Sequence, residues 1–277
     1  MALSIQSNMA SKAIQNQLSR TNSDLSVALE RLGSGFRINS AKDDAAGLQI
    51  ANRLNAQVRG QEAAIYNANN ANSMLQTAEG AFEEMTNIAF RMKELATQAA
   101  NGTNNASEYT ALDSEYQALA AELDSIMTNT SYGSGTTLLD GGKFAAAVTF
   151  QIGSSAAETL EVDISAEITA VAASVGAPGA LGDQAAGVAA MATVDTLIDN
   201  IGAARASLGA SMNRLDHTIN NLTNMTENTQ AAASQLMDAD FAKETSNMTK
   251  QQLLMNSGIS VLSASNSTTQ MIGSLLR

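Results

Sequence analysis

The sequence has 277 residues, with 15 basic against 27 acidic side chains and a formal net charge of −12. This balance argues against a nucleic-acid partner, because such proteins need a basic surface to displace counterions from phosphate. The chain has no cysteine, which excludes disulfides and thiolate metal sites. No basic start with an apolar run is visible, and no segment approaches the ~20 apolar residues of a membrane span. We therefore expect no membrane insertion, and these criteria alone favour a cytoplasmic protein.

The first predicted helix carries apolar or small residues at alternating spacings of four and three. The positions are Ile14, Leu18, Thr21, Leu25, Ala28 and Leu32. Such a stripe is typical of a coiled-coil seam. The seam stops at Gly33, where a glycine is expected to end the helix.

The segment RLGSGFRINSAKDD, residues 31–44, then raises the question of a phosphate or metal site. It lacks the third glycine and the Lys-Ser/Thr pair of known phosphate loops. Adjacent aspartates at a helix start would also project in different directions. We instead predict that Ser40 is an N-cap and that Asp43 and Asp44 stabilise the first helical turn electrostatically. The segment is then an interdomain joint, whose residues are Gly33, Gly35, Arg37, Ser40, Asp43 and Asp44.

The charges around this joint leave two readings open. Basic and acidic side chains alternate there, so they could form ion pairs between copies of the chain, each worth about 0–1 kcal/mol at a surface. The other reading is a solvated, charged linker.

Three further seams occupy the middle of the chain. They comprise Leu75, Ala78, Phe82, Met85, Ala89, Met92 and Ala96; Leu112, Tyr116, Leu119, Leu123 and Ile126; and Ile201, Leu208, Leu215 and Leu222. Between them, VTFQI (148–152) and LEVDI (160–164) alternate apolar and polar residues and predict a β-hairpin. The following VGAPGALGDQAAG predicts a loop.

The predicted C-terminal helix shows the same seven-residue spacing of apolar residues as the first helix. Its seven-residue row is Phe241, Met248, Met255, Leu262, Thr269 and Leu276, and its alternate row is Ile259, Asn266 and Gly273. We expect the two terminal helices to pair antiparallel. Their stripes are too polar to hold alone, so we also expect burial against other copies. The predicted polymerisation seams are Ile14, Leu18, Leu25, Leu32, Met248, Met255, Ile259, Leu262 and Leu276. The predicted fold is mainly α, a long antiparallel helical rod with coiled-coil termini and a small β-hairpin.

Catalytic chemistry finds little support in the sequence. His217 is the only histidine, and no second ligand or HExxH motif accompanies it. No motif places two carboxylates around a pocket, as a hydrolase would need. A cytoplasmic coiled-coil scaffold would carry longer charged rows beside its seams. We expect no enzyme activity, cofactor or metal.

Several long motifs resemble those of bacterial flagellins. They are ERLGSGFRINSAKDDAAG (30–47), NANNANSMLQTAEGAFEEMTNI (67–88), ELATQAANGTN (94–104), ASLGASMNRLDHTINNLTN (206–224), DADFAKETSNMTK (238–250) and the terminal GSLLR. The resemblance implies a subunit of the flagellar filament with a short central region. It also implies an extracellular location, reached unfolded through the flagellar type III export channel without a cleaved signal peptide. A hook–filament junction protein, which shares the terminal helices, is the alternative.

The resemblance further implies domains and partners. The domains are an inner core of residues 1–43 and 236–277, a helical rod of 44–140 and 190–235, and a hairpin with a surface-exposed variable loop at 141–189. The partners are other copies of the chain, the export apparatus with its flagellin chaperone, and the hook-associated and cap proteins. FRMKELATQ (90–98) resembles the segment that animal Toll-like receptor 5 recognises, with Arg91, Leu95 and Glu115 as the matching positions.

Overall fold

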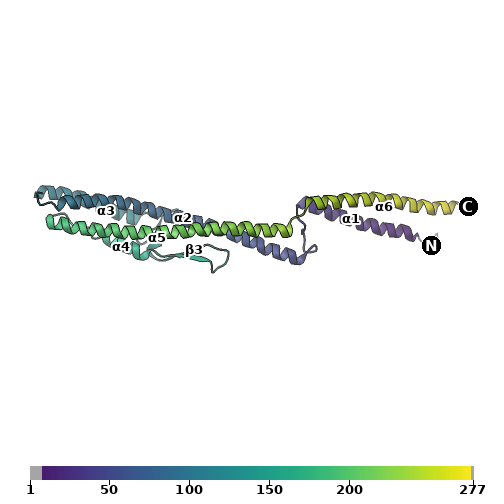
Figure 1. The fold of residues 1–277 in the computed structure, drawn as a ribbon, viewed down its shortest axis with the longest axis horizontal. Helices are drawn as coiled ribbons and strands as arrows, with labels where there is room; N and C mark the ends of the chain where they lie inside the picture. The colour runs from purple at the N-terminus through teal and green to yellow at the C-terminus, as the bar shows by residue number, and fades with distance from the viewer. Residues whose placement is uncertain (1–7, 276–277) are drawn as a thin grey trace. The chain divides into compact units, whose positions relative to one another are not determined.

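The computed structural model describes residues 8–275 of the chain, which is mainly α-helical (Figure 1). The seam position Leu276 lies outside these residues, and Thr269 and Gly273 lie outside the part of the last helix whose side chains are described. The elements are α1 (Met9–Ser34), α2 (Ala45–Ala99), α3 (Ala106–Asn129), β1 (Ser131–Tyr132), β2 (Thr136–Thr137), the 3₁₀ turn η1 (Lys143–Ala145), β3 (Val148–Gln151), β4 (Thr159–Val162), α4 (Ser165–Val175), α5 (Gln184–Met237) and α6 (Phe241–Leu275). The predicted mainly α class and small hairpin are confirmed.

The chain divides into two compact units. Unit 1 comprises residues 1–56 and 228–277, and unit 2 comprises 57–227. The divisions fall within α2 and α5. The three-part division predicted from the sequence stays a prediction.

In unit 2, α2 and α5 run antiparallel, and polar side chains mark their register. Thr226 Oγ1 donates to Gln61 Oε1 (3.3 Å), and Asn72 Nδ2 donates to Asp216 Oδ1 (3.0 Å). Farther along, Arg205 Nε donates to Glu79 Oε1 (2.8 Å), and Lys93 pairs with Asp195. The residue number rises along α2 as it falls along α5, which defines an antiparallel pair.

The core of unit 2 holds large side chains that are fully buried. Among them are Tyr116, Phe82, Phe144, Leu75 and Met85. All members of the predicted seams at 75–96 and 201–222 are buried. In α3, Tyr116 and Leu123 are buried, while the other three predicted positions pack partly buried against the same core. The three seams predicted from the spacing of apolar residues thus identified this core correctly.

The central segment 141–189 differs from its prediction in one respect. The β3–β4 hairpin forms as expected, with Val148 opposite Val162. The irregular segment predicted after the hairpin is present at 176–183 and is mostly exposed, but the prediction missed helix α4, and several side chains of 141–189 are buried in the core of unit 2. These are Leu160, Val162, Ile164, Ile168, Val171, Val175 and Leu181. The buried residues of α4 recur at helical spacing, but the many alanines around them conceal the pattern in the sequence.

The connection from α4 to α5 is tied to α3 by three hydrogen bonds. The Tyr116 hydroxyl donates to the Pro178 carbonyl (2.7 Å), and Gln117 Nε2 donates to the Gly179 carbonyl (2.7 Å). The Leu181 N–H donates to Asp113 Oδ1 (2.8 Å). This segment is therefore held as part of the unit, although it has no regular structure of its own.

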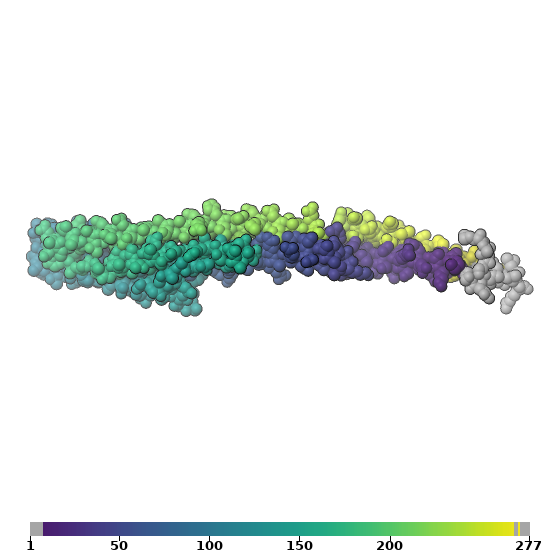
Figure 2. All heavy atoms as spheres, turned by 90° about the horizontal axis from the view of Figure 1, so that it is seen from below, coloured from purple at the N-terminus to yellow at the C-terminus, as the bar shows by residue number. Residues whose placement is uncertain are grey.

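Unit 1 is a pair of antiparallel helices, α1 and α6, with a sparse core. Figure 2 shows the surface of α1, in purple, beside that of α6, in yellow. Apart from Leu25 and Ala28, the buried side chains along the two helices are polar: Ser11, Thr21 and Glu244. Two long helices can therefore pair here with little apolar surface removed from water.

Candidate assembly surface

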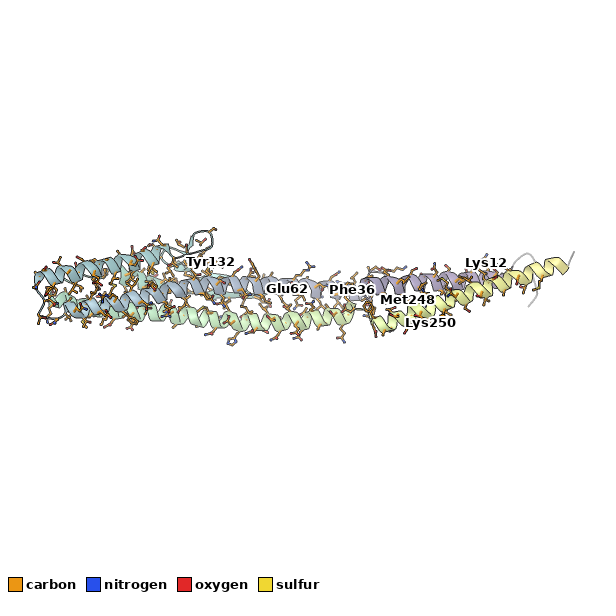
Figure 3. All side chains as sticks on the ribbon, turned by 90° about the horizontal axis from the view of Figure 1, so that it is seen from above. Lys12, Phe36, Glu62, Tyr132, Met248 and Lys250 are labelled. Carbon is orange, nitrogen blue, oxygen red and sulfur yellow. The ribbon has the colours of Figure 1, made fainter. Side chains whose placement is uncertain are left out.

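The contact row of α6 recurs at three- and four-residue steps. It comprises Glu244, Met248, Gln251, Met255, Gly258, Leu262 and Ser265, of which Glu244 is buried and the others are half-buried. Figure 3 labels Met248, which belongs to this row, and Lys250, which lies two residues further on and is exposed. The predicted positions Met248, Met255 and Leu262 thus lie on one face of α6, and their role in polymerisation stays a proposal.

Two predicted seam residues of α6 do not face α1 in the single chain: Ile259 of the alternate row is 55% exposed, and Phe241 of the seven-residue row is 59% exposed. Their role in polymerisation stays a proposal. For Ile259, the reason for the exposure is the close approach of the two helices at Gly258. A Cβ built on Gly258 would lie 2.7 Å from Leu18 Cδ2, so a side chain at this position would require Leu18 to move. The small residue takes the contact position, and Ile259 turns away by one helical step.

The predicted seam residues of α1 lie in its contact with α6, as expected. Leu25 is buried, while Ile14, Leu18 and Leu32 are half-buried. Near the far end of the pair, Asn8 Nδ2 donates to the Ser265 carbonyl (3.2 Å), and Ser11 Oγ donates to Asn266 Oδ1 (3.1 Å). The predicted antiparallel pairing of the terminal helices is present, with hydrogen bonds where a coiled coil would have apolar contacts.

At the other end of the pair, Arg31 and Glu244 form an ion pair. Arg31 Nη1 lies 3.3 Å from Glu244 Oε1, and the Glu244 side chain is almost fully buried. Asn247 Nδ2 donates to the second carboxylate oxygen at 3.4 Å. A buried charge is costly without its partner, so this pair favours one alignment of α1 against α6.

Large apolar side chains cover the outer faces of both helices. On α6, Leu253 is 65% exposed, Leu254 45% and Val261 51%, besides Phe241 and Ile259. On α1, Met9 and Leu29 are exposed in the same way. We call these seven side chains the outer apolar set. These exposed side chains are available for association with another protein surface.

The joint after α1 differs in detail from its prediction. Gly33 lies inside α1, and Gly35 caps the helix in the left-handed conformation (φ 77°), with its N–H donating to the Arg31 carbonyl. The prediction that Gly33 ends the helix is therefore wrong by two residues. A residue with a Cβ is strained at positive φ, so Gly35 is the position that requires glycine.

The predicted cap of α2 is also displaced. Ser40 does not cap the helix; its backbone N–H and its hydroxyl donate to Asp43 Oδ2 at 2.9 and 3.0 Å. These bonds, with the one from the backbone N–H first, hold the pKa of the Asp43 carboxyl below its ordinary value. The cap is Asp44, whose Oδ1 accepts the Gly47 N–H at 2.8 Å. Asp44 therefore takes the cap position that the sequence assigned to Ser40, and Asp43 binds Ser40 instead.

Arg37 binds a helix end rather than a carboxylate. Its Nη2 donates to the Leu236 carbonyl (2.8 Å) near the C-terminus of α5. Its backbone N–H donates to the Met237 carbonyl (2.6 Å), and the Ala239 N–H donates to the Gly35 carbonyl (2.9 Å). Phe36 and Asp238 thus form an antiparallel β-bridge between the two linkers of unit 1. A cation at a helix C-terminus is favoured by the helix dipole.

The three residues predicted for receptor recognition do not share one surface in unit 2. Arg91 is exposed and bridges Glu115 (2.7 Å) and Glu94 (2.8 Å). These carboxylates, with Glu115 contributing most, raise the pKa of Arg91 above its ordinary value. Leu95 is 1% exposed and packs in the core. Leu95 therefore supports the helix from inside, and only Arg91 and Glu115 are available at the surface.

Within residues 8–275 no group of three or more histidine, cysteine or acidic side chains is arranged to hold a metal ion. Likewise, no helix in this range is long and apolar enough to cross a membrane. The described part of the chain combines a self-contained helical unit with a thinly packed pair of terminal helices that expose apolar side chains. That combination indicates a structural protein, with the terminal helices as the candidate assembly surface.

Comparison with known proteins identifies the family. The profile of the bacterial flagellin N-terminal helical region matches residues 5–143, and that of the bacterial flagellin C-terminal helical region matches 191–276. The chain belongs to the flagellin family.

Relatives and a solved structure agree with this membership. The chain is 35% identical to flagellin A of Vibrio anguillarum, over 95% of this chain and 96% of that protein. It is 37% identical to a flagellin of Halalkalibacterium halodurans, over 90% and 91%. The crystal structure of Bacillus cereus flagellin superposes with a TM-score of 0.50 at 33% identity, covering 61% of this chain and 94% of that one.

Proposed function

We propose that this protein is the structural subunit that polymerises into the bacterial flagellar filament, the helical propeller of swimming cells. Family membership over most of the chain supports this function. The observation that carries it physically is the outer apolar set on α1 and α6. Those side chains are exposed in the single chain and would be removed from water by packing between copies, at about 25 cal/mol per Å² of apolar surface.

The alternative, a hook–filament junction protein, has no specific observation in its favour. A putative flagellar hook-associated protein of Vibrio parahaemolyticus superposes with a TM-score of 0.54, but at 16% identity this likeness concerns the fold alone. Copy number separates the two functions, because a filament subunit is present in thousands of copies and a junction protein in few.

Seeded assembly tests the proposal. Purified monomer is added to short filament fragments, and growth is followed by electron microscopy and light scattering. We expect tubes to elongate. Circular dichroism should show a gain of helix on assembly, because the α1–α6 pair buries too little to stay fully helical alone. A monomer that never elongates seeds, at any concentration, would contradict the proposal.

The remaining expectations follow from the family and stay part of this proposal. They are export in an unfolded state, delivery by a chaperone, contact with hook-associated and cap proteins, and recognition by Toll-like receptor 5. For the receptor, the geometry favours a contact through Arg91 and Glu115, since both are exposed on neighbouring helices.

A further inference from the structure

The turn between α2 and α3 contains the one Asn-Gly pair of the sequence, Asn101-Gly102. Both residues are exposed. An asparagine side chain can be attacked at Cγ by the backbone nitrogen of the next residue. That reaction needs an accessible nitrogen and little steric obstruction from the next side chain, and glycine offers none.

Hydrogen bonding distinguishes this asparagine from Asn39, Asn104 and Asn105, which also lie outside the helices. After Asn39, the Ser40 N–H donates to Asp43; after Asn104, the Asn105 N–H donates to Glu108 Oε2 at 2.8 Å. The Asn105 side chain is itself engaged as the cap of α3. Within helices, each N–H is occupied by a backbone carbonyl beyond the first turn. The Gly102 N–H, by contrast, has no hydrogen-bond partner among the described residues.

The electrophilic atom, Cγ of Asn101, belongs to a side chain that is exposed at the surface. Asn101 Oδ1 accepts only a long bond, 3.4 Å, from the Thr103 N–H. The Asn101 backbone is anchored, because its N–H donates to the Gln98 carbonyl (3.2 Å) and its carbonyl accepts from the Tyr109 hydroxyl (3.3 Å). The side-chain amide can therefore rotate toward the Gly102 nitrogen while the turn stays in place.

We propose that Asn101-Gly102 is a site of spontaneous covalent modification by deamidation. The Gly102 nitrogen forms a bond to Asn101 Cγ and loses its proton, while the side-chain nitrogen leaves with that proton as ammonia. The product is a five-membered succinimide. Water then adds to one of its two carbonyl carbons and opens the ring, which yields either aspartate or isoaspartate. Water is the sole co-reactant, and no electron is gained or lost.

The modification changes the turn in two ways. Both products place a carboxylate just beyond the C-terminus of α2, where the helix dipole disfavours negative charge. Isoaspartate also adds one methylene to the main chain. There is little room for it, because α5 begins close by: a Cβ on Gly187 would lie 2.6 Å from the Ala100 nitrogen. The inference concerns unit 2 alone and does not depend on the proposed function.

Mass spectrometry of the full-length protein, aged in buffer at mildly alkaline pH, tests the proposal. We expect the peptide containing Asn101 to gain the mass of an amide-to-acid conversion and, in heavy-oxygen water, to take up one labelled oxygen. Isoaspartate should appear in the same peptide. The peptide containing Asp140-Gly141 is assayed separately, because an Asp-Gly pair forms the same ring by losing water.

Two variants make the test specific. Gly102→Ala should slow the reaction at least several-fold; the new Cβ fits, because its nearest neighbour is Gln184 Oε1 at 3.4 Å and the φ of Gly102 is not positive. Ser40→Gly creates a second Asn-Gly pair whose N–H is held by Asp43, and it should react several-fold more slowly than Asn101. Circular dichroism verifies that both variants fold. Equal rates at the two pairs, or an unchanged rate in Gly102→Ala, would overturn the proposal.

Discussion

The two units of this chain both pack long helices against one another, but they differ in the residue types at the helix contacts. Unit 2 buries phenylalanine, tyrosine, leucine and methionine between its helices, and polar contacts lie around that core. Unit 1 mixes buried serine, threonine and glutamate with mostly half-buried leucine and methionine in the contact between α1 and α6, and other leucine, isoleucine and valine side chains lie exposed. The difference shows which unit is complete alone. Unit 2 has a large buried apolar core of its own, whereas unit 1 buries few apolar side chains, and we propose that it packs against other copies.

The largest effect that separates the units should come from deletion. Removing residues 256–277 takes away more than half of α6, with Ile259 and Val261 of the outer apolar set. We expect no filament at any concentration, while unit 2 keeps its thermal transition, because none of its core residues is touched. Electron microscopy and calorimetry measure the two outcomes. If the truncated chain still forms tubes, the assembly role of α6 is wrong.

A matched pair of leucines sharpens the comparison. Leu208 is fully buried in unit 2, so Leu208→Ala should cost about 2–5 kcal/mol of unfolding free energy. Leu262 is half-buried in unit 1, and Leu262→Ala should leave the main transition of the monomer unchanged. Denaturant unfolding of the two variants gives the comparison directly. Similar losses of free energy in both would mean that unit 1 is part of the same cooperative core.

Alkaline pH should weaken unit 2 through Tyr116. Burial raises the pKa of this phenol from 10.0 to about 12. Because the folded-state pKa is the higher one, the neutral phenol stabilises the fold fully below pH 10. That contribution is lost as pH rises from about 10 through about 12, and the two-unit shift corresponds to about 3 kcal/mol.

Unfolding of the wild type across this range is compared with that of Tyr116→Phe. The variant loses the hydrogen bond to Pro178 at every pH, which costs about 1 kcal/mol. It should lack the part of the alkaline loss that Tyr116 causes. Parallel pH profiles for the two proteins would show that Tyr116 does not titrate in this way.

The smallest effect concerns Arg37 in unit 1. Arg37→Met removes the guanidinium that binds the Leu236 carbonyl, and for this exposed group the cost is about 0.5 kcal/mol. Added to every subunit, that cost should raise the critical concentration for assembly about twofold. Arg20→Met is the control, because Arg20 is exposed on α1 with no hydrogen bond in the described range. An equal change in both variants would indicate a general charge effect.

The sequence predicted the parts of the fold that large apolar residues define. Phe82 and Met85 lie on one stripe of α2, and Leu208 lies on the corresponding stripe of α5. Stripes of large apolar residues at helical spacing are expected to face a core. The antiparallel pairing of α1 with α6 was predicted for the same reason. The failures occur where a small or polar residue decides the structure. Gly258 takes the contact position that hydrophobicity assigns to Ile259, because the Leu18 side chain packs where a side chain at 258 would begin.

The joint shows a second reason for failure. Ser40 and Asp44 are both good cap residues, and the sequence does not say which one the helix will use. Asp43 decides the matter by accepting the Ser40 N–H, which leaves Asp44 to cap α2. Similarly, Gly33 and Gly35 are equally able to end α1, and the backbone bridge to Ala239 fixes the second. Contacts distant in sequence make these choices, so local patterns do not reveal them.

The bridge between Phe36 and Asp238 has a consequence for how such chains change length. By joining the two linkers, it closes everything between them into a ring. The entropy lost on closing a ring grows only with the logarithm of its size, about 0.6 kcal/mol for each doubling of a flexible loop. Extra sequence inserted into the surface of unit 2 therefore adds little to the cost of bringing the two ends together. The paired termini can stay the same while the ring between them is short in one protein and long in another.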